Sequence, residues 1–475
     1  MKILQNFIYN FIYQILIIII PTITVPYVSR VLGVEGVGIF SLTTANISVF
    51  VLIASIGVNT YGNREIAYYQ NDIQKRSQVF WEINLLRFLM SVISLFLSLI
   101  FIVNIKDYQL YYCLQVITII AGIFDVSWFF MGLEDFKRVV TRNLLIKVLS
   151  VVLIFIFVKN SDDLSLYILI NSLSILFGNL SILPSLRNKI IFLNWKQLKI
   201  YHHFKPALLL FLPQISGTVF EVINKNMLSF LRSVDDVGFF NQSNLLFRTF
   251  LAIVTALGVV MLPRMSALIS ENNYEQIQKL LIKSSEVILA ISLPIMFGLL
   301  AISKQFVPFF FGEGFDAVIL LIIIESFALP ISGLLNVVGM QYLIPTNQLK
   351  YSTVSYIFGS VSNLLLNFTL IPFLGVNGTM LSFVLAELFT LIFQLWVVRH
   401  QIKINLLFTE MWKYFLSGLL MFVCVFVIMN TSSFSVYLLI SACFIGVIIY
   451  FILIYLLKTS LTKDILAFLS LKLKK

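Results

Sequence analysis

The chain has 475 residues, of which 59% are hydrophobic and only 12% are charged, and its mean hydropathy is +0.98. Soluble domains carry about 25% charged residues, so this composition excludes a soluble globular protein and indicates a polytopic membrane protein. The net charge of +11 does not indicate nucleic-acid binding, because the basic residues lie in short loops between apolar runs and form no basic soluble domain.

Apolar runs of about 17 to 27 residues predict an all-α fold with fourteen transmembrane helices. The first six spans and the next six form two lobes, at residues 1–205 and 206–400, and residues 401–475 hold two further helices and a tail. The predicted spans are 7–28, 39–61, 78–104, 108–133, 141–159, 164–186, 206–232, 238–264, 284–305, 317–343, 351–371, 376–397, 413–429 and 436–457.

The distribution of basic residues predicts the orientation of these helices in the membrane. Twenty-five of the 33 lysines and arginines lie at the termini, in the loops that follow even-numbered spans or in the adjoining helix ends, against five in the opposite loops and helix ends. Short cytoplasmic loops carry an excess of lysine and arginine. Both termini are therefore expected in the cytoplasm, and the outer loops are too short to form a folded external domain.

Polar side chains repeat at helical spacing within several apolar spans. The second span carries such a set, which includes Ser48 and Asn59. The seventh span carries six polar residues at intervals of three or four, which places them on one face of a helix. These six are Gln214, Thr218, Glu221, Lys225, Ser229 and Arg232, and the eighth span continues the pattern with Asn241, Asn244, Arg248 and Thr255.

Two of these residues are cations deep within a predicted span. Counted from the helix ends, Lys225 and Arg248 lie roughly 10 and 15 Å into the membrane. A charge at such depth costs about 2.5 to 3.5 kcal/mol on insertion scales, so it normally faces a bundle interior or a water-filled cavity. Glu221 is four residues from Lys225 and can pair with it, which leaves Arg248 as the uncompensated cation. The sequence therefore predicts a cationic cavity.

Other charged residues inside spans have structural alternatives. A single Ser, Thr or Asn in a membrane helix more often bonds a neighbouring helix than a ligand, whereas an ionisable residue favours a function. Arg87 and Asp125 lie at similar depth and are interpreted as a structural ion pair. Glu325 and Glu387 are candidates for coupling transport to a cation, with a hydrogen bond to a neighbouring helix as the alternative.

The cysteines and histidines indicate neither a metal site nor a cofactor. Cys113, Cys424 and Cys443 fall inside apolar spans, where a free cysteine behaves as a small hydrophobic residue. The three histidines lie in basic loops and form no set with ligand spacing, so a solvated loop position is predicted for each of them, at His202, His203 and His400.

Short matches about 200 residues apart indicate an internal duplication. Each match is weak alone, but they occur in the same order in both halves. Because six spans separate the copies, both lobes would run in the same direction, around a site near the middle of the membrane. The matched segments are 37–40 with 237–240, 57–58 with 258–259, and 72–75 with 276–279.

Three stretches of the chain match recognisable motifs. The stretch from Val25 to Gly38 matches the signature P-Y-x-S-R-x-L-G-x-x-G-x-G, the segment Asn63-Arg64-Glu65-Ile66-Ala67 matches N-R-E-x-A, and Trp128 to Glu134 matches W-x-x-x-G-x-E. Together they resemble the motifs of oligosaccharide flippases, the Wzx-type polysaccharide transporters of the MOP superfamily. The resemblance extends over essentially the whole chain.

The resemblance implies a bacterial inner-membrane protein that moves an undecaprenyl-pyrophosphate-linked oligosaccharide from the cytoplasmic to the outer leaflet. It further implies two six-helix lobes that open alternately around a central cavity, with two C-terminal helices outside them. Na⁺ or H⁺ coupling and contacts with the polymerase machinery are expected from the relatives. Arg248 and Lys225 are the candidates for binding the pyrophosphate, with Arg30 and Arg64 at the outer and inner mouths.

Three other functions remain open on the sequence. A lipid II flippase shares the architecture and the cavity arginines. A multidrug exporter of the same superfamily needs acids in its cavity, whereas the first span has none and Glu221 is close to Lys225. A membrane polymerase or glycosyltransferase is the alternative from another class, and it would be expected to carry a long external loop. No enzymatic site or nucleotide-binding loop is recognised in the sequence.

Overall fold

The computed structural model describes residues 2–192, 198–271, 273–431, 434–464 and 466, without the side chains of 2–19, 212–217, 257, 259, 260 and 263. Every regular element among the described residues is helical. This follows from the hydrocarbon environment that the composition implies, in which a helix satisfies its backbone hydrogen bonds within one segment. The chain divides into two compact units.

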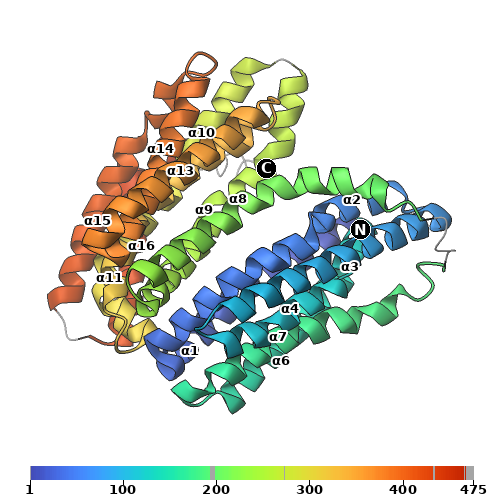
Figure 1. Cartoon of the computed structure of the whole chain (residues 1–475). Coiled ribbons are helices and arrows are strands. Elements are labelled where there is room, and N and C mark those ends of the chain that lie inside the picture. The colour runs from blue at the N-terminus through green and yellow to red at the C-terminus, as the bar shows by residue number, and fades with distance from the viewer. Residues whose placement is uncertain (1, 193–197, 272, 432–433, 465, 467–475) are drawn as a thin grey trace. The chain divides into compact units, whose positions relative to one another are not determined.

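Unit 1 comprises residues 1–229 and 233–238. Its helices α3, α4, α7 and α6 pack one against the next, and α1 contacts α3, α4 and α6 (Figure 1). The elements of this part of the chain are α1 (Lys2–Ser55), α2 (Val58–Tyr68), α3 (Ile73–Asn104), α4 (Gln109–Ile123), α5 (Ser127–Gly132), α6 (Phe136–Phe157), the 3₁₀ turns η1 (Ser161–Asp163) and η2 (Leu183–Leu186), α7 (Leu164–Ile182) and α8 (Tyr201–Leu231).

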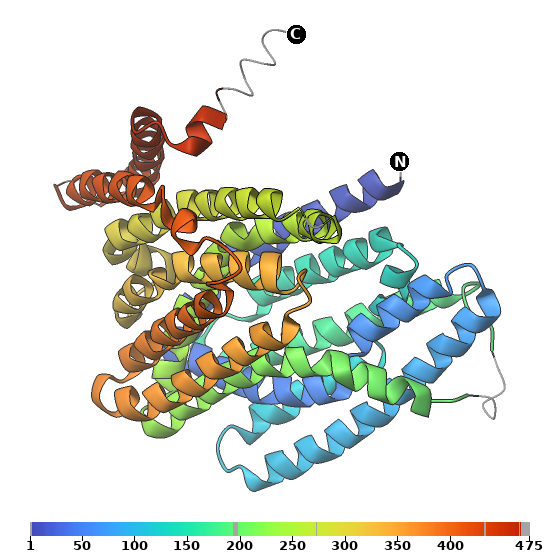
Figure 2. The same ribbon diagram turned by 90° about the horizontal axis from the view of Figure 1, so that it is seen from above.

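Unit 2 comprises residues 230–232 and 239–475. Its helices α13 and α14 pack along each other, and α15 packs against both α10 and α16 (Figure 2). Its elements are most of α9 (Val234–Ser270), then α10 (Tyr274–Phe311), α11 (Ala317–Ser326), α12 (Ala328–Leu335), the π-helix η4 (Asn336–Leu343), α13 (Leu349–Leu374), α14 (Val376–Val398), the 3₁₀ turn η5 (Ile404–Phe408), α15 (Met411–Thr431) and α16 (Val436–Leu456).

The division between the units differs from the one expected at residue 205. Helix α8 was expected to begin the second lobe, yet it belongs to unit 1 as far as Ser229. The reason is packing at its first turns, where Ala207, Leu208 and Leu210 join a core cluster built from α2, α3 and α5. The predicted lobes remain a prediction.

Among the described residues, eleven segments are long and apolar enough to cross a membrane. The segment from Ile20 to Tyr68 is one of these, and it includes the whole predicted span 39–61 and the end of the predicted span 7–28. Within α1, the helical dihedral angles are interrupted at Gly33, where φ is 68° and ψ is −175°. A positive φ favours glycine, which explains the glycine at this position of the signature. The chain is a multi-pass membrane protein, and the number of fourteen helices remains a prediction.

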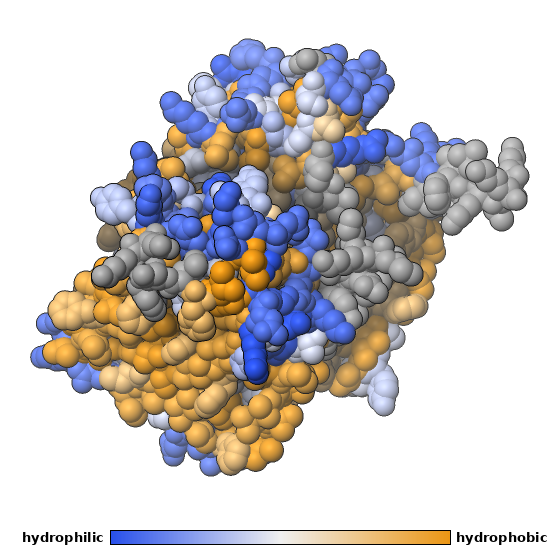
Figure 3. Space-filling model, turned by 90° about the vertical axis from the view of Figure 1, so that its right-hand side faces the viewer, coloured by the Kyte–Doolittle hydropathy of each residue, from blue (hydrophilic) through white to orange (hydrophobic). Residues whose placement is uncertain are grey.

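Helix α3 shows how the surface is adapted to lipid. Its buried face carries Ser91, Ser94 and Ser98, whereas Phe88 and Phe96 are 45% and 65% exposed. Small residues allow close packing between membrane helices, and large apolar residues are stable in contact with lipid. The face shown in Figure 3 has a broad apolar area in its lower part, and most of the hydrophilic side chains lie above that area in the view. This distribution is the reverse of that in a soluble protein.

Segments 34–38 and 234–238, which overlap the matched segments 37–40 and 237–240, contact each other, and both belong to unit 1. A methyl group on Gly38 would lie 2.1 Å from the carbonyl oxygen of Val234. Conversely, a methyl group on Gly238 would lie 2.6 Å from the carbonyl oxygen of Val34. The contact is therefore reciprocal, and the two pairs of contacting residues are related by the same offset of 200.

The N-R-E-x-A motif and the W-x-x-x-G-x-E motif also contact each other within unit 1. A methyl group on Gly62 would lie 2.4 Å from Cε3 of Trp128, and one on Gly132 would lie 2.7 Å from the carbonyl oxygen of Asn63. Trp128 is 1% exposed. These glycines allow α2 and α5 to approach closely, so the two motifs together form one packing contact.

Candidate functional site

Helix α8 holds a cation inside unit 1. Nζ of Lys225 lies 2.7 Å from Oε1 of Glu221, one helical turn earlier. The Lys225 side chain is 6% exposed and that of Glu221 is 31% exposed, so the ammonium is the more buried partner. A buried lysine needs both a counter-charge and hydrogen bonds. The i, i+4 spacing of Glu221 and Lys225 predicted this ion pair. The carboxylate of Glu221 supplies both the counter-charge and a hydrogen-bond acceptor.

A chain of side-chain hydrogen bonds, called the relay, begins at Asn226, the residue that follows Lys225. Asn226 donates to Oδ1 of Asn46 at 2.6 Å, and Asn46 donates to the hydroxyl of Tyr112 at 2.8 Å. The relay joins α8, α1 and α4 within unit 1. Neither asparagine was singled out in the sequence, although an asparagine within an apolar span is a signal that a polar partner lies on another helix.

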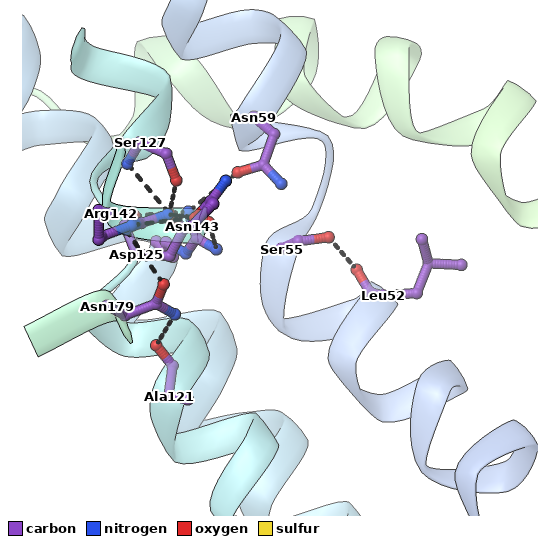
Figure 4. A network of polar contacts seen from close by, with 10 residues as sticks. Leu52, Ser55, Asn59, Ala121, Asp125, Ser127, Arg142, Asn143 and Asn179 are labelled. Carbon is purple, nitrogen blue, oxygen red and sulfur yellow. Dashed lines mark hydrogen bonds and ion pairs between the residues drawn. The ribbon is translucent and has the colours of Figure 1, made fainter. Parts of the chain in front are cut away.

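Arg87 and Asp125 form the ion pair that the sequence predicted. Nη2 of Arg87 lies 3.1 Å from Oδ2 of Asp125, and Nη1 donates to the Asp125 carbonyl at 2.9 Å. Asp125 lies between α4 and α5, where its other carboxylate oxygen accepts from the backbone and hydroxyl groups of Ser127. Asn59, on α2, accepts from Nη1 of Arg87 at 3.1 Å. Figure 4 shows Asn59, Asp125 and Ser127 converging.

Arg87, Asp125, Ser127 and Asn59 form a polar cluster, and a second arginine lies beside it. Arg142, on α6, donates from Nε and Nη2 to Oδ1 of Asn143 at 3.0 and 2.6 Å. It lies beside Asp125 in Figure 4, where Asn179 links it to the carbonyl of Ala121. The cluster therefore brings two arginines and one aspartate together within an apolar unit.

In unit 2, Arg248 lies at the end of a hydrogen-bonded chain. Its Nε donates to Oδ1 of Asn244 at 2.7 Å, and Asn244 donates to Oε1 of Glu325 at 3.0 Å. The hydroxyl of Ser243 donates to the other oxygen of Glu325 at 2.5 Å. The prediction that Arg248 is an uncompensated cation stays a prediction, because Asn244 is a neutral amide. A carboxylate on α11, more than 70 residues away in the chain, is linked to it through one amide.

The remaining predicted residues occupy separate places. Arg30 and Arg64 are both exposed. Arg30 approaches the Pro26 carbonyl at 3.4 Å, and Arg64 pairs with Glu65 at 3.0 Å while it lies over the ring of Tyr61. Ser48 donates to the carbonyl of Ala45 in its own helix, Thr218 and Asn241 are half-buried, Glu387 accepts from the hydroxyl of Ser332, and the side chain of Gln214 lies outside the described residues.

One histidine contradicts the prediction of a solvated loop position. His203 is 7% exposed, and its Nε2 lies 2.7 Å from Oε2 of Glu82. Its Nδ1 lies 2.7 Å from the hydroxyl of Tyr61. Helix α8 begins at Tyr201, so His203 falls in its first turn and packs against α2 and α3 instead of lying in a loop. Glu82 lies within the predicted span 78–104, and the need of an acid in a membrane helix for a polar partner was the available signal.

Several charged residues within the apolar helices, such as Lys225, Arg87 and Glu325, thus bond neighbouring carboxylates, amides or hydroxyls. An all-helical, multi-pass scaffold with such internal charge is that of a membrane transporter. The chain belongs to the family described as "Polysaccharide biosynthesis protein", whose model matches residues 3–269, more than half of the chain. The predicted resemblance to oligosaccharide flippases is confirmed.

Two relatives align over nearly their whole length. One is a "Putative O-antigen transporter" of Shigella dysenteriae, 26% identical over 386 residues, which cover 80% of this chain and 96% of the relative. The other has the same name in Escherichia coli K12 and is 24% identical over 411 residues, which cover 83% and 96%. Both are named as transporters, in agreement with the prediction that the protein is not an enzyme.

Solved structures share the fold at low sequence identity. The lipid II flippase MurJ, in an inward closed conformation, has a TM-score of 0.74 at 15% identity, over 95% of this chain and 98% of MurJ. An inward-facing multidrug transporter of the MATE family has a TM-score of 0.57 at 16% identity, over 83% and 99%. The chain therefore has the same fold as these two transporters.

Proposed function

We propose that the protein flips an undecaprenyl-pyrophosphate-linked oligosaccharide from the cytoplasmic to the outer leaflet of the bacterial inner membrane. The product would serve O-antigen, capsule or a related surface polysaccharide. The family and the names of the two relatives support this class of substrate. The proposed architecture is two parallel six-helix lobes around a central cavity, which opens alternately to each side, with two C-terminal helices outside the lobes and both termini in the cytoplasm.

The observation that carries the proposal is the pair of cations held on apolar helices. Lys225 is buried beside Glu221, and Arg248 is linked through Asn244 to Glu325. A pyrophosphate diester carries two negative charges and does not cross hydrocarbon unaided, so a transporter must offer fixed cations and hydrogen-bond donors in a hydrated path. Asn, Gln, Ser and Thr side chains in the same helices suit sugar hydroxyls.

Three alternative functions remain distinguishable. The likeness to MurJ keeps a lipid II flippase as the second candidate. A multidrug exporter would need an acidic cavity, and here the carboxylates of Glu221 and Glu325 are linked to cations. A polymerase acts on substrate that has already crossed the membrane. Loss of a flippase therefore leaves single lipid-linked units on the cytoplasmic leaflet, whereas loss of a polymerase leaves them outside.

Coupling to an ion gradient belongs to the same proposal. Glu325 and Glu387 are carboxylates within the predicted spans, and each accepts a hydrogen bond from a serine hydroxyl. A Na⁺ or H⁺ gradient would supply the energy for export if either carboxylate exchanged its ion between the two open states. Contacts with membrane lipids and with the polysaccharide polymerase complete the proposed partners.

Replacing Arg248 tests the proposed function. Arg248→Ala is expected to abolish polysaccharide export while the protein level stays normal, because the anionic head loses a fixed cation. Arg248→Lys is expected to restore part of the export, since lysine keeps the charge but lacks the planar fork of donors. The measurement is surface polysaccharide together with mass spectrometry of lipid-linked units. Export by Arg248→Ala at the parental level would contradict the proposal.

A further inference from the structure

Asn59 lies at a break between two helices of unit 1. Helix α1 ends at Ser55, Gly57 adopts a φ of 72°, and α2 begins at Val58. Asn59 is therefore in the first turn of α2, and its side chain is exposed. An exposed amide would ordinarily present either its oxygen or its nitrogen by rotation about its last torsion.

Arg87 fixes which end of this amide points outward. Oδ1 of Asn59 accepts from Nη1 of Arg87 at 3.1 Å. A guanidinium carries only donors, so the group that faces it must be the oxygen of the amide. Rotating the amide would place its NH₂ group against another donor. In Figure 4 the oxygen of Asn59 points into the cluster and the nitrogen points away from it.

The arginine is itself held in place. Arg87 is 4% exposed, and both of its terminal nitrogens bond Asp125. Asp125 is fixed in turn by Ser127 across the break between α4 and α5. The orientation of Asn59 is therefore set by groups from α3 and from the α4–α5 break, and its two outward N–H groups lie beside a positive charge.

We propose that Asn59 is a substrate-binding residue that donates to an acceptor oxygen of the transported head group, and that Arg87 is its positioning residue. This inference rests on the proposed function. The acceptor is an oxygen of the pyrophosphate or of the sugar. A cationic ligand would meet only donors beside a guanidinium, so the same arrangement disfavours the substrates of a multidrug exporter.

The test uses the full-length protein in nanodiscs, with undecaprenyl pyrophosphate and the phosphate-free glycoside dodecyl maltoside as probes. Asn59→Asp keeps an oxygen for Arg87 but removes both outward donors. A purely structural role therefore predicts unchanged binding, whereas the proposal predicts binding weakened on the order of ten- to a hundredfold. Asn59→Leu removes the donors without adding charge and is expected to show the same loss. Arg87→Lys keeps the charge and is expected to lose less affinity than either.

Asn104→Asp is the matched control, because Asn104 is also exposed in unit 1 but donates to the Ile100 carbonyl of its own helix. Weaker binding of only one probe identifies the acceptor as pyrophosphate or sugar. Parental affinity for both probes in Asn59→Asp or in folded Asn59→Leu would overturn the inference and leave the proposed function standing, provided that Arg248→Ala still loses export. If the parental protein binds neither probe, the proposed function fails, and this inference with it.

Discussion

Glu82 shows how a single carboxylate organises a membrane-embedded region. Its Oε1 accepts from the backbone N–H of Lys199 at 2.7 Å and from the amide of Gln78 at 3.0 Å. Its Oε2 lies 2.7 Å from Nε2 of His203. An ionised carboxylate only accepts, so Nε2 carries a hydrogen, and the hydroxyl of Tyr61 donates to Nδ1 when the ring is neutral. The side chain of Glu82 is 6% exposed and His203 is 7% exposed, so the bond between these two residues has little access to water.

Replacing Glu82 is therefore expected to destabilise unit 1. Glu82→Leu leaves the Lys199 N–H and His203 without their acceptor, at a cost of roughly 1–3 kcal/mol for the buried donor on His203. Glu82→Gln keeps one oxygen and is expected to be intermediate. The measurement is the thermal unfolding midpoint of the purified protein in detergent. Equal midpoints for the parental protein and Glu82→Leu would refute this role of Glu82.

Contacts between residues differ in how far the sequence can predict them. The pair Glu221–Lys225 follows from its i, i+4 spacing, because one helix fixes the distance between its own residues. Arg87–Asp125 followed from equal depth in adjacent helices. The contact between Glu82 and His203 joins residues 121 apart, and it depends on where α8 begins. Spacing along the chain carries no information about such a contact.

At the scale of elements, close approach of helices depends on a few glycines. The contact between segments 34–38 and 234–238 leaves no space for a Cβ atom on either Gly38 or Gly238, and the obstructing atoms are backbone. Backbone atoms cannot rotate away as a flexible side chain can. A larger residue must therefore separate the two segments.

Gly38→Ala is expected to lower stability by about 1–3 kcal/mol, the usual cost of overpacking. Gly122→Ala is the matched control, because a methyl group on Gly122 would have no heavy atom within 4 Å and alanine favours the helix. Unfolding midpoints of the two variants in detergent make the comparison. The prediction fails if Gly38→Ala is as stable as Gly122→Ala.

Most helices could be predicted from the sequence, whereas their interruptions could not. Apolar length is sufficient to identify a span, so the run at 108–133 was predicted as one helix. The structure divides it into α4 and α5 at Asp125, because the carboxylate and carbonyl of this residue bond Arg87 on another helix. The π-helix η4 within the predicted span 317–343 carries no distinct pattern of hydrophobicity. Tertiary hydrogen bonds decide such features.

For the molecule as a whole, the distribution of charge predicts which loops face the cytoplasm. Exposed Lys106 follows the third predicted span and is expected outside, whereas exposed Lys350 follows the tenth and is expected inside. The three native cysteines are exposed as well, so a labelling experiment must first remove Cys113, Cys424 and Cys443.

In that cysteine-free background, Lys106→Cys is expected to react with a membrane-impermeant maleimide in intact spheroplasts. Lys350→Cys is expected to react only after the membrane is disrupted, because a cytoplasmic thiol is shielded from the reagent. The extent of labelling is measured by the shift in mass of the purified protein. Reaction of Lys350→Cys in intact spheroplasts, with Lys106→Cys protected, would show the opposite orientation.

The reciprocal contact of Gly38 with Val234 and of Gly238 with Val34 has a consequence for the origin of the chain. Exchanging the two segments leaves the contact unchanged, and this is the property that lets two identical molecules associate about a twofold axis. A half-length ancestor with a single copy of the segment would have needed no new surface to form a homodimer. On the duplication predicted from the sequence, gene fusion would then have joined two subunits that already fitted each other, and each glycine would have been inherited from one original residue.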